Sequence, residues 1–221
     1  MEIREDLSKV SGARMVATLF GVLAGLGGLT HGIGEMLQGN VTPDGLIINS
    51  WTQGPIAAYM GGEPGMTIVP NLFLTGLLTT LVSLATIVWS AVFMQRKNGG
   101  RVLIGLSVLM LLFGGGFGPP VIGILAGAAG TGIRSSSAGL RARLFGGNGR
   151  FAAIVWPWLF ALAAASGIFL VIGSVILVTL FSLDNDQLFL NTFYLTVVSL
   201  FLTVVMTPAY DSQHSGRAIP I

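Results

Sequence analysis

The chain has 221 residues, of which 52% are hydrophobic and 9% are charged, and its mean hydropathy is +0.81. A soluble domain usually carries about 25% charged residues, so this composition excludes an ordinary water-facing surface and indicates a protein that lies mostly in lipid. The absence of cysteine excludes disulfides, thiolate metal sites and cysteine nucleophiles, and the net charge of +2 does not indicate a nucleic-acid partner.

The first apolar segment follows a short polar stretch and is predicted to be a membrane helix. It runs from about residue 13 to residue 37, and Arg14 anchors its inner end. Val22-Leu23-Ala24 resembles a signal-peptide cleavage site, which makes a leader the competing interpretation. Acids among the first six residues, and an apolar run that continues past the possible cut, favour the membrane helix.

The connection over residues 39–65 contains acids but no lysine or arginine, so we expect it to be an external loop. Its Trp51 suits the outer headgroup layer, and part of the loop is expected to lie along the interface. The second membrane helix is predicted over residues 67–94. Arg96 and Lys97 come shortly after it, so this end is expected on the inner side.

The third apolar segment is predicted to form a hairpin with arms at residues 102–117 and 119–133. Arg101 precedes the segment and Arg134 follows it, so a single crossing would put the next basic residues outside. Between the arms lies the run GGGFGPP (114–120), in which proline removes a backbone donor and glycine relaxes the helix. Each arm spans about 24–27 Å at 1.5 Å per residue, against a hydrocarbon core of about 30 Å. Two short crossings and a deep re-entrant loop both fit, and we favour the two crossings.

The last third of the chain is predicted to cross the membrane twice more. Residues 134–150 are rich in serine, glycine and arginine and are expected to form a cytoplasmic loop. Pro157 predicts an interfacial entry over 151–157, followed by a crossing over 158–181. An acidic external turn then leads to the last crossing over 189–206, which we expect to end just before a proline.

Together these segments predict an all-α fold, a polytopic transmembrane helix bundle of five or six membrane segments in one integral membrane domain (1–221). All eleven lysines and arginines can be placed on one side of the membrane. This positive-inside pattern is typical of a bacterial inner or plasma membrane protein, here with both termini in the cytoplasm. The expected partners are the lipid bilayer and other helices, including those of a homo-oligomer. Anionic lipid heads are expected near Arg96, Lys97, Arg141 and Arg143.

The strongest group of candidate functional residues lies at the outer end of the first helix. His31, Glu35 and Gln38 are spaced i, i+4, i+7 and share one helical face, which predicts that they point into the bundle with the small residues Gly27 and Gly28. Ionisable groups at membrane depth are usually functional, so proton or ligand handling is one interpretation. A structural hydrogen bond between His31 and Glu35 is another, and a metal site is a third that would need further ligands.

The Gly-Pro break supplies a second candidate site, at Phe117 and Pro119. A broken helix frees backbone groups inside the membrane, and these need partners from neighbours, water or a ligand. In transporters such interrupted segments mark the binding site, whereas a tight turn between two short helices is the alternative without a site.

Two stripes of hydroxyl side chains follow helical spacing in the second and last predicted helices. Such faces line a polar pathway or make interhelical hydrogen bonds. In the second helix the stripe comprises Asn71, Thr75, Thr79, Ser83, Thr86 and Ser90, and in the last helix Thr192, Thr196, Ser199, Thr203 and Thr207.

The run HGIGEMLQGN (31–40) and the run GGGFGPP (114–120) resemble those of a family of small bacterial multi-pass membrane proteins that has no known activity. The resemblance covers about residues 13–133. It implies a location in the membrane and little else.

Three classes of function fit these observations. The first is a small permease, channel or transport-system subunit that uses the Gly-Pro break, with His31 and Glu35 at the outer mouth. The second is a non-catalytic scaffold or sensor whose partners dock on residues 134–150. A membrane-embedded enzyme with His31 as acid or base ranks last, because no second internal acid or nucleophile is evident. The sequence contains no P-loop, dinucleotide or zincin motif, so we expect no cofactor.

Overall fold

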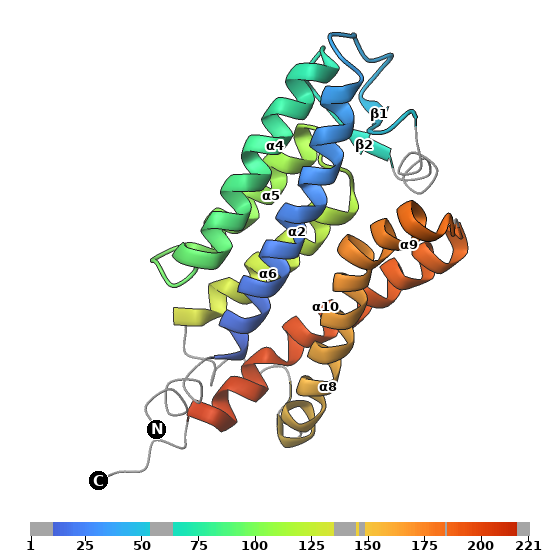
Figure 1. The fold of residues 1–221 in the computed structure, drawn as a ribbon. Coiled ribbons are helices and arrows are strands. Elements are labelled where there is room, and N and C mark those ends of the chain that lie inside the picture. The colour runs from blue at the N-terminus through green and yellow to red at the C-terminus, as the bar shows by residue number, and fades with distance from the viewer. Residues whose placement is uncertain (1–10, 54–63, 135–144, 146–148, 184, 216–221) are drawn as a thin grey trace, which may run out of the picture.

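A computed structural model describes residues 11–53, 64–134, 145, 149–183 and 185–215 (Figure 1). The described residues are 79% helical and form six helical rods and one short pair of antiparallel strands. The helical rods are α2 (Gly12–Leu37), α4 (Leu72–Val88) continued by the π-helical turn η1 (Trp89–Phe93), α5 (Gly99–Leu112), α6 (Gly118–Thr131) continued by the 3-10 turn η2 (Gly132–Arg134), α8 (Gly149–Ile168) continued by the π-helical turn η4 (Phe169–Gly173) and α9 (Ser174–Phe181), and α10 (Asp186–Ser215). The strands are β1 (Ile47–Asn49) and β2 (Pro64–Met66).

Four of the described rods are long and apolar enough to cross a membrane, so the protein is a membrane-embedded helical protein. They are Gly12–Leu37, Leu72–Phe93, Gly149–Phe181 and Asp186–His214. α5 and α6 have 14 residues each, about 21 Å of helix, which is less than the roughly 30 Å hydrocarbon core. The all-α prediction is therefore confirmed.

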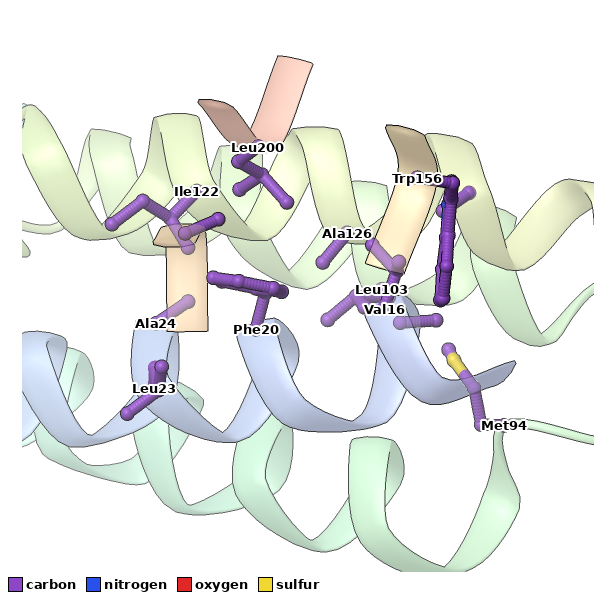
Figure 2. Close-up of a cluster of buried hydrophobic side chains, with 13 residues drawn as sticks. Val16, Phe20, Leu23, Ala24, Met94, Leu103, Ile122, Ala126, Trp156 and Leu200 are labelled. Atoms are coloured by element: carbon purple, nitrogen blue, oxygen red, sulfur yellow. The ribbon is translucent and has the colours of Figure 1, made fainter. Parts of the chain in front are cut away.

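α2 lies at the centre of the arrangement, with α4 on one side and α6 on another (Figure 1). α5 and α6 form a hairpin beside it, while α8, α9 and α10 form a second, longer hairpin that meets the rest near the ends of the chain. The core lies where these units meet, with Phe20 of α2 among Ile122 of α6, Leu200 of α10 and their neighbours (Figure 2). Since lipid tails are as apolar as these side chains, close packing is what favours this association.

Glycine brings α2 into close contact with α4. A Cβ atom added at Gly25 would lie 2.5 Å from Ile87 Cγ1 and 2.8 Å from the Ser83 carbonyl oxygen, both closer than real atoms approach. One added at Gly32 would lie 2.7 Å from Thr80 Oγ1. The hydroxyl stripe of α4 therefore packs against the glycine face of α2, and its members from Thr75 to Ser90 are fully buried.

Polar contacts join the second hairpin to the bundle near the start of α2. Trp156 Nε1 donates to the Thr203 carbonyl oxygen (3.1 Å) and to Thr207 Oγ1 (3.0 Å), which joins α8 to α10. The Asp211 carboxylate accepts from the backbone N–H groups of Gly12 (2.6 Å) and Ala13 (3.3 Å). A carboxylate at a helix N-terminus satisfies free N–H groups there, so Asp211 ties α10 to the start of α2. The hydroxyl stripe of α10 serves packing, because Thr196, Thr203 and their neighbours donate to carbonyls one turn earlier in the same helix.

The predicted break in the 102–133 segment is confirmed. The chain leaves the helix after Leu112 and turns through Gly114 and Gly116, whose φ values of +104° and +72° favour glycine. α6 begins at Gly118 with proline in its first turn, where a missing N–H costs nothing. The two arms run back along each other, since a Cβ atom at Gly100 would meet the backbone of residues 127–131.

Other helices have bounds that differ from those of the predicted membrane segments. α4 begins at Leu72, because Asn71 caps it by accepting from the Leu74 N–H (3.0 Å). The predicted entry over 151–157 is part of one helix, with Pro157 inside it, and α10 continues past Pro208 to Ser215.

Two predicted loops are only partly described. The predicted external loop contains the β1–β2 pair, which the sequence analysis did not anticipate. Most of residues 134–150, including Arg141 and Arg143, lie outside the described residues.

Gly25→Val should destabilise the protein, because the new side chain overlaps Ile87 and the α4 backbone. Overpacking of this kind costs about 1–3 kcal/mol. The matched control is Gly105→Val in α5, where an added Cβ atom meets nothing within 4 Å. Thermal unfolding in detergent, followed by tryptophan fluorescence, should give a lower Tm for Gly25→Val than for the control. Equal Tm values for the two variants would contradict the close α2–α4 contact.

Candidate functional site

Two ionisable side chains are buried one turn apart near the C-terminal end of α2. His31 is 1% exposed and Glu35 is 0% exposed. Their i, i+4 spacing puts both on the face that meets the turn between α5 and α6, as the glycine contacts at that turn show. A buried ionisable group is costly unless it is hydrogen-bonded, so the partners of these two residues decide what the site can do.

Ser50, which follows β1, joins the two side chains. Its Oγ donates to Glu35 Oε1 at 3.0 Å and lies 2.8 Å from His31 Nδ1. Ser50 is itself 1% exposed. The three residues therefore form a continuous hydrogen-bonded chain, with the hydroxyl in the middle, in a place closed to bulk water.

This chain has two arrangements that differ by one proton. With Glu35 ionised, Ser50 donates to Glu35 and His31 Nδ1–H donates to Ser50. A proton accepted at His31 Nε2 lets Nδ1 release its proton to Ser50, whose own proton moves to Glu35. Glu35 then donates to Ser50 and Ser50 donates to Nδ1, so the added charge has passed from one end of the chain to the other.

The glycines of the α5–α6 turn close over the two ionisable side chains. A Cβ atom at Gly114 would lie 2.5 Å from Glu35 Oε1 and 2.6 Å from Oε2, and one at Gly116 would collide with the His31 ring at Nε2. Among the described residues, Glu35 Oε2 has no hydrogen-bond partner. The Thr79 hydroxyl borders the carboxylate, but its proton is directed at the Phe113 carbonyl oxygen.

Gln38 holds the Ser50 segment against α2. Its Nε2 donates to the carbonyl oxygens of Asn49 (2.8 Å) and Ser50 (2.9 Å). From the other side, Trp51 Nε1 donates to the Thr30 carbonyl oxygen (2.9 Å). The Gln38 side chain thus binds the loop backbone, and its role in this geometry is to position Ser50.

A cavity of about 400 Å³ lies beside this chain, between α2 and α6 on one side and η4, α9 and α10 on the other. Of the predicted site residues, His31, Phe117 and Pro119 line it, whereas Glu35 and Gln38 do not. Thr30 and Asp186 add polar groups to walls that are otherwise mainly apolar. His31 is therefore the predicted residue that belongs both to the cavity wall and to the hydrogen-bonded chain.

The geometry weighs against two other kinds of chemistry. Within the described parts of the chain, no three His, Asp or Glu side chains form a group that could hold a metal ion. In a hydrolytic triad the carboxylate holds the histidine and the histidine activates the hydroxyl. Here the Ser50 hydroxyl is shared between both, so its proton is directed away from His31 when Glu35 is ionised.

Sequence reasoning did not find Ser50 or Asp186. Ser50 lies 19 residues from His31 and 15 from Glu35, in a loop with no helical periodicity. The acidic turn before α10 was evident, but nothing in the sequence placed it beside the first helix. Comparison of the chain with protein-family models, with curated proteins and with solved structures finds no match.

Gly116→Ala should destabilise the site for two reasons, a strained backbone and a clash with His31. Gly39→Ala is the matched control, because Gly39 has a φ of +82° and nothing within 4 Å of an added Cβ atom. Both variants carry the left-handed backbone cost of about 1–2 kcal/mol. The clash should lower the unfolding free energy of Gly116→Ala by a further ~1–3 kcal/mol relative to the control, as measured in detergent. If the two variants lose the same stability, the turn does not press on His31.

Proposed function

We propose that the protein is a small permease, or a subunit of a transport system, in the inner or plasma membrane of a bacterium. In this proposal His31, Ser50 and Glu35 handle a proton beside the outer cavity. The observation that carries it is the buried hydrogen-bonded chain with one end in the cavity wall. Ionisable groups at membrane depth are expensive and usually mark an ion, proton or substrate pathway.

The hydrogen-bonded chain of His31, Ser50 and Glu35 lies beside the cavity, and this gives the proposal a mechanism. A solute in the cavity contacts His31 directly, whereas Glu35 is reached only through Ser50. The solute thereby changes the surroundings of one end of the chain and not of the other. Binding of the solute and the distribution of the proton are then linked, as coupled transport requires.

The proposed topology has six crossings and both termini in the cytoplasm. The α5–α6 hairpin runs beside α2 from Ala13, which lies 3.9 Å from a Cβ atom built at Gly132, to His31, which Gly116 covers. Eighteen residues of helix are about 27 Å, close to the thickness of the hydrocarbon core. The hairpin thus extends over the depth of the membrane although each of its helices is short.

The distribution of charge supports the same orientation. The basic side chains of the described residues lie at the inner ends of their helices, where Gln95 contacts the Arg14 guanidinium. They are Arg14, Arg96, Lys97, Arg101 and Arg150. By the positive-inside rule this end faces the cytoplasm.

The orientation predicts which introduced cysteines react from outside. The chain has no cysteine, so single substitutions need no further engineering. Asn185→Cys, before α10, should react in intact cells with a membrane-impermeant maleimide. Asn98→Cys, before α5, should react only after permeabilisation. A single crossing by the 102–133 segment would put both positions on the same side, so labelling of both from outside, or of neither, contradicts the hairpin topology.

The proposed proton path through His31, Ser50 and Glu35 predicts that a substitution at any of the three residues removes proton transport. In liposomes with a potassium diffusion potential and an internal pH dye, the wild-type protein should carry protons. His31→Ala, Ser50→Ala and Glu35→Gln should each reduce this flux to near the level of protein-free liposomes, because each breaks the chain. Ser90→Ala is the matched control, since its hydroxyl is buried, has no partner among the described residues and lies outside the chain. Thermal unfolding of each variant excludes misfolding, and unchanged flux in all three folded variants would refute the proposal.

A further inference from the structure

The outer cavity has the size and lining of a site for a small organic molecule. Its volume of about 400 Å³ falls within the range of roughly 300–1,000 Å³ that such sites occupy. Ile122, Leu170, Val175 and Leu190 contribute apolar side chains to its wall. An inorganic ion or a sugar gains nothing from these surfaces, so they favour a ligand with a bulky apolar body.

Charge in and around the cavity has one sign. Asp186 lies in its lining, and among the described residues no lysine or arginine does. The sequence has no lysine or arginine from Met15 to Gln95, from Val102 to Ile133 or from Phe151 to Gly216, so in the proposed topology none of the described residues in the outer half is a lysine or an arginine. An anionic ligand would meet Asp186 without a compensating charge, whereas a cation would be attracted to it.

Aromatic rings add a second preference for a cation. Phe117, Phe189 and Phe193 all line the cavity. The face of an aromatic ring attracts a positive charge, and the attraction increases where water is excluded. Rings and carboxylate together suit a ligand that is apolar over most of its surface and positive at one point.

The wall formed by η4 is an independent indication of a built site. Residues Phe169–Gly173 adopt a π-helix, and two of them, Leu170 and Val171, line the cavity. π-helical turns inside α-helices are rare and frequently occur at functional sites. This one interrupts the rod from α8 to α9 at the level of the cavity.

We infer that the cavity takes an amphipathic organic cation, a molecule with an apolar body and one amine or onium group, held by Asp186 and the phenylalanine rings. This inference rests on the proposed transport function and names the substrate class of the same cavity. No covalent step is involved. The ligand enters with its charge near Asp186 and its apolar part between α6 and η4.

The experiment uses two probes that have the same four phenyl groups and opposite charges, tetraphenylphosphonium and tetraphenylborate. The full chain is placed in phosphatidylcholine nanodiscs, and binding is measured by equilibrium dialysis with empty nanodiscs subtracted. Tetraphenylphosphonium should bind saturably, at one site per chain, and tetraphenylborate should not. Equal saturable binding of both ions, binding of the anion alone, or binding of neither would overturn the inference and leave a cavity filled by lipid chains.

Two variants locate the site. Asp186→Asn should weaken tetraphenylphosphonium binding by up to about fivefold, as expected for an exposed charge. Its matched control is Asp44→Asn, an exposed external carboxylate that does not line the cavity. Phe193→Leu keeps an apolar wall but removes a ring face, and should weaken binding of the cation by about two- to fivefold. Its control is Phe73→Leu, on the exposed face of α4. If each variant binds as its control does, the cation does not occupy this cavity.

The binding experiment and the proton-flux experiment test different proposals. Binding in nanodiscs needs no transport, so a protein that binds the cation but carries no protons would refute the proposed function alone. A protein whose proton flux depends on His31, Ser50 and Glu35, but which does not distinguish the two probes, would refute only the substrate class.

Discussion

No water competes for polar groups in the interior of a membrane bundle, so each buried donor or acceptor needs a partner from the chain itself. At the outer end of α2 this requirement falls on an imidazole and a carboxylate. Their shared partner, Ser50, comes from outside the membrane helices and is held by Gln38 and Trp51. The external loop is therefore part of the site, because without its hydroxyl both ionisable groups would be buried without that bond.

The same site depends on residues that have no side chain. Gly114 and Gly116 allow the α5–α6 turn to lie directly on Glu35 and His31, and their positive φ values give the chain the curvature to do so. On another face of α2, Gly25 and Gly32 bring α4 equally close. The backbone of other elements thus closely approaches α2 on two faces, and Thr30 and His31 are the polar residues of α2 that line the cavity.

Local sequence signals predicted much of this arrangement. Hydropathy gave the long helices, proline and glycine gave the turn after Leu112, and helical spacing brought His31 and Glu35 together. Ser50 was beyond such reasoning, because its place depends on the pairing of Ile47–Asn49 with Pro64–Met66 and on the fold of the loop around it.

The helix ends predicted at Pro157 and Pro208 differ from the structure for a physical reason. In water a helix that ends at proline exposes its free backbone groups to solvent, whereas in lipid those groups would stay unpaired. Continuing the helix loses one hydrogen bond, and ending it inside the membrane loses several. The helices that contain Pro157 and Pro208 accordingly continue past these residues. A rule drawn from soluble proteins thus fails where the solvent changes.

The cavity follows from how the second hairpin is attached. Trp156 and Asp211 join α8 and α10 to each other and to the start of α2. The cavity lies farther along the hairpin, between the later half of α2 and the residues of η4, α9 and the start of α10 that line it. Apolar side chains from α6, η4 and α10 line this space, so an apolar molecule within it gains dispersion contacts with several walls. Because His31 borders that space and also hydrogen-bonds Ser50, whatever fills the cavity is in contact with the proton chain.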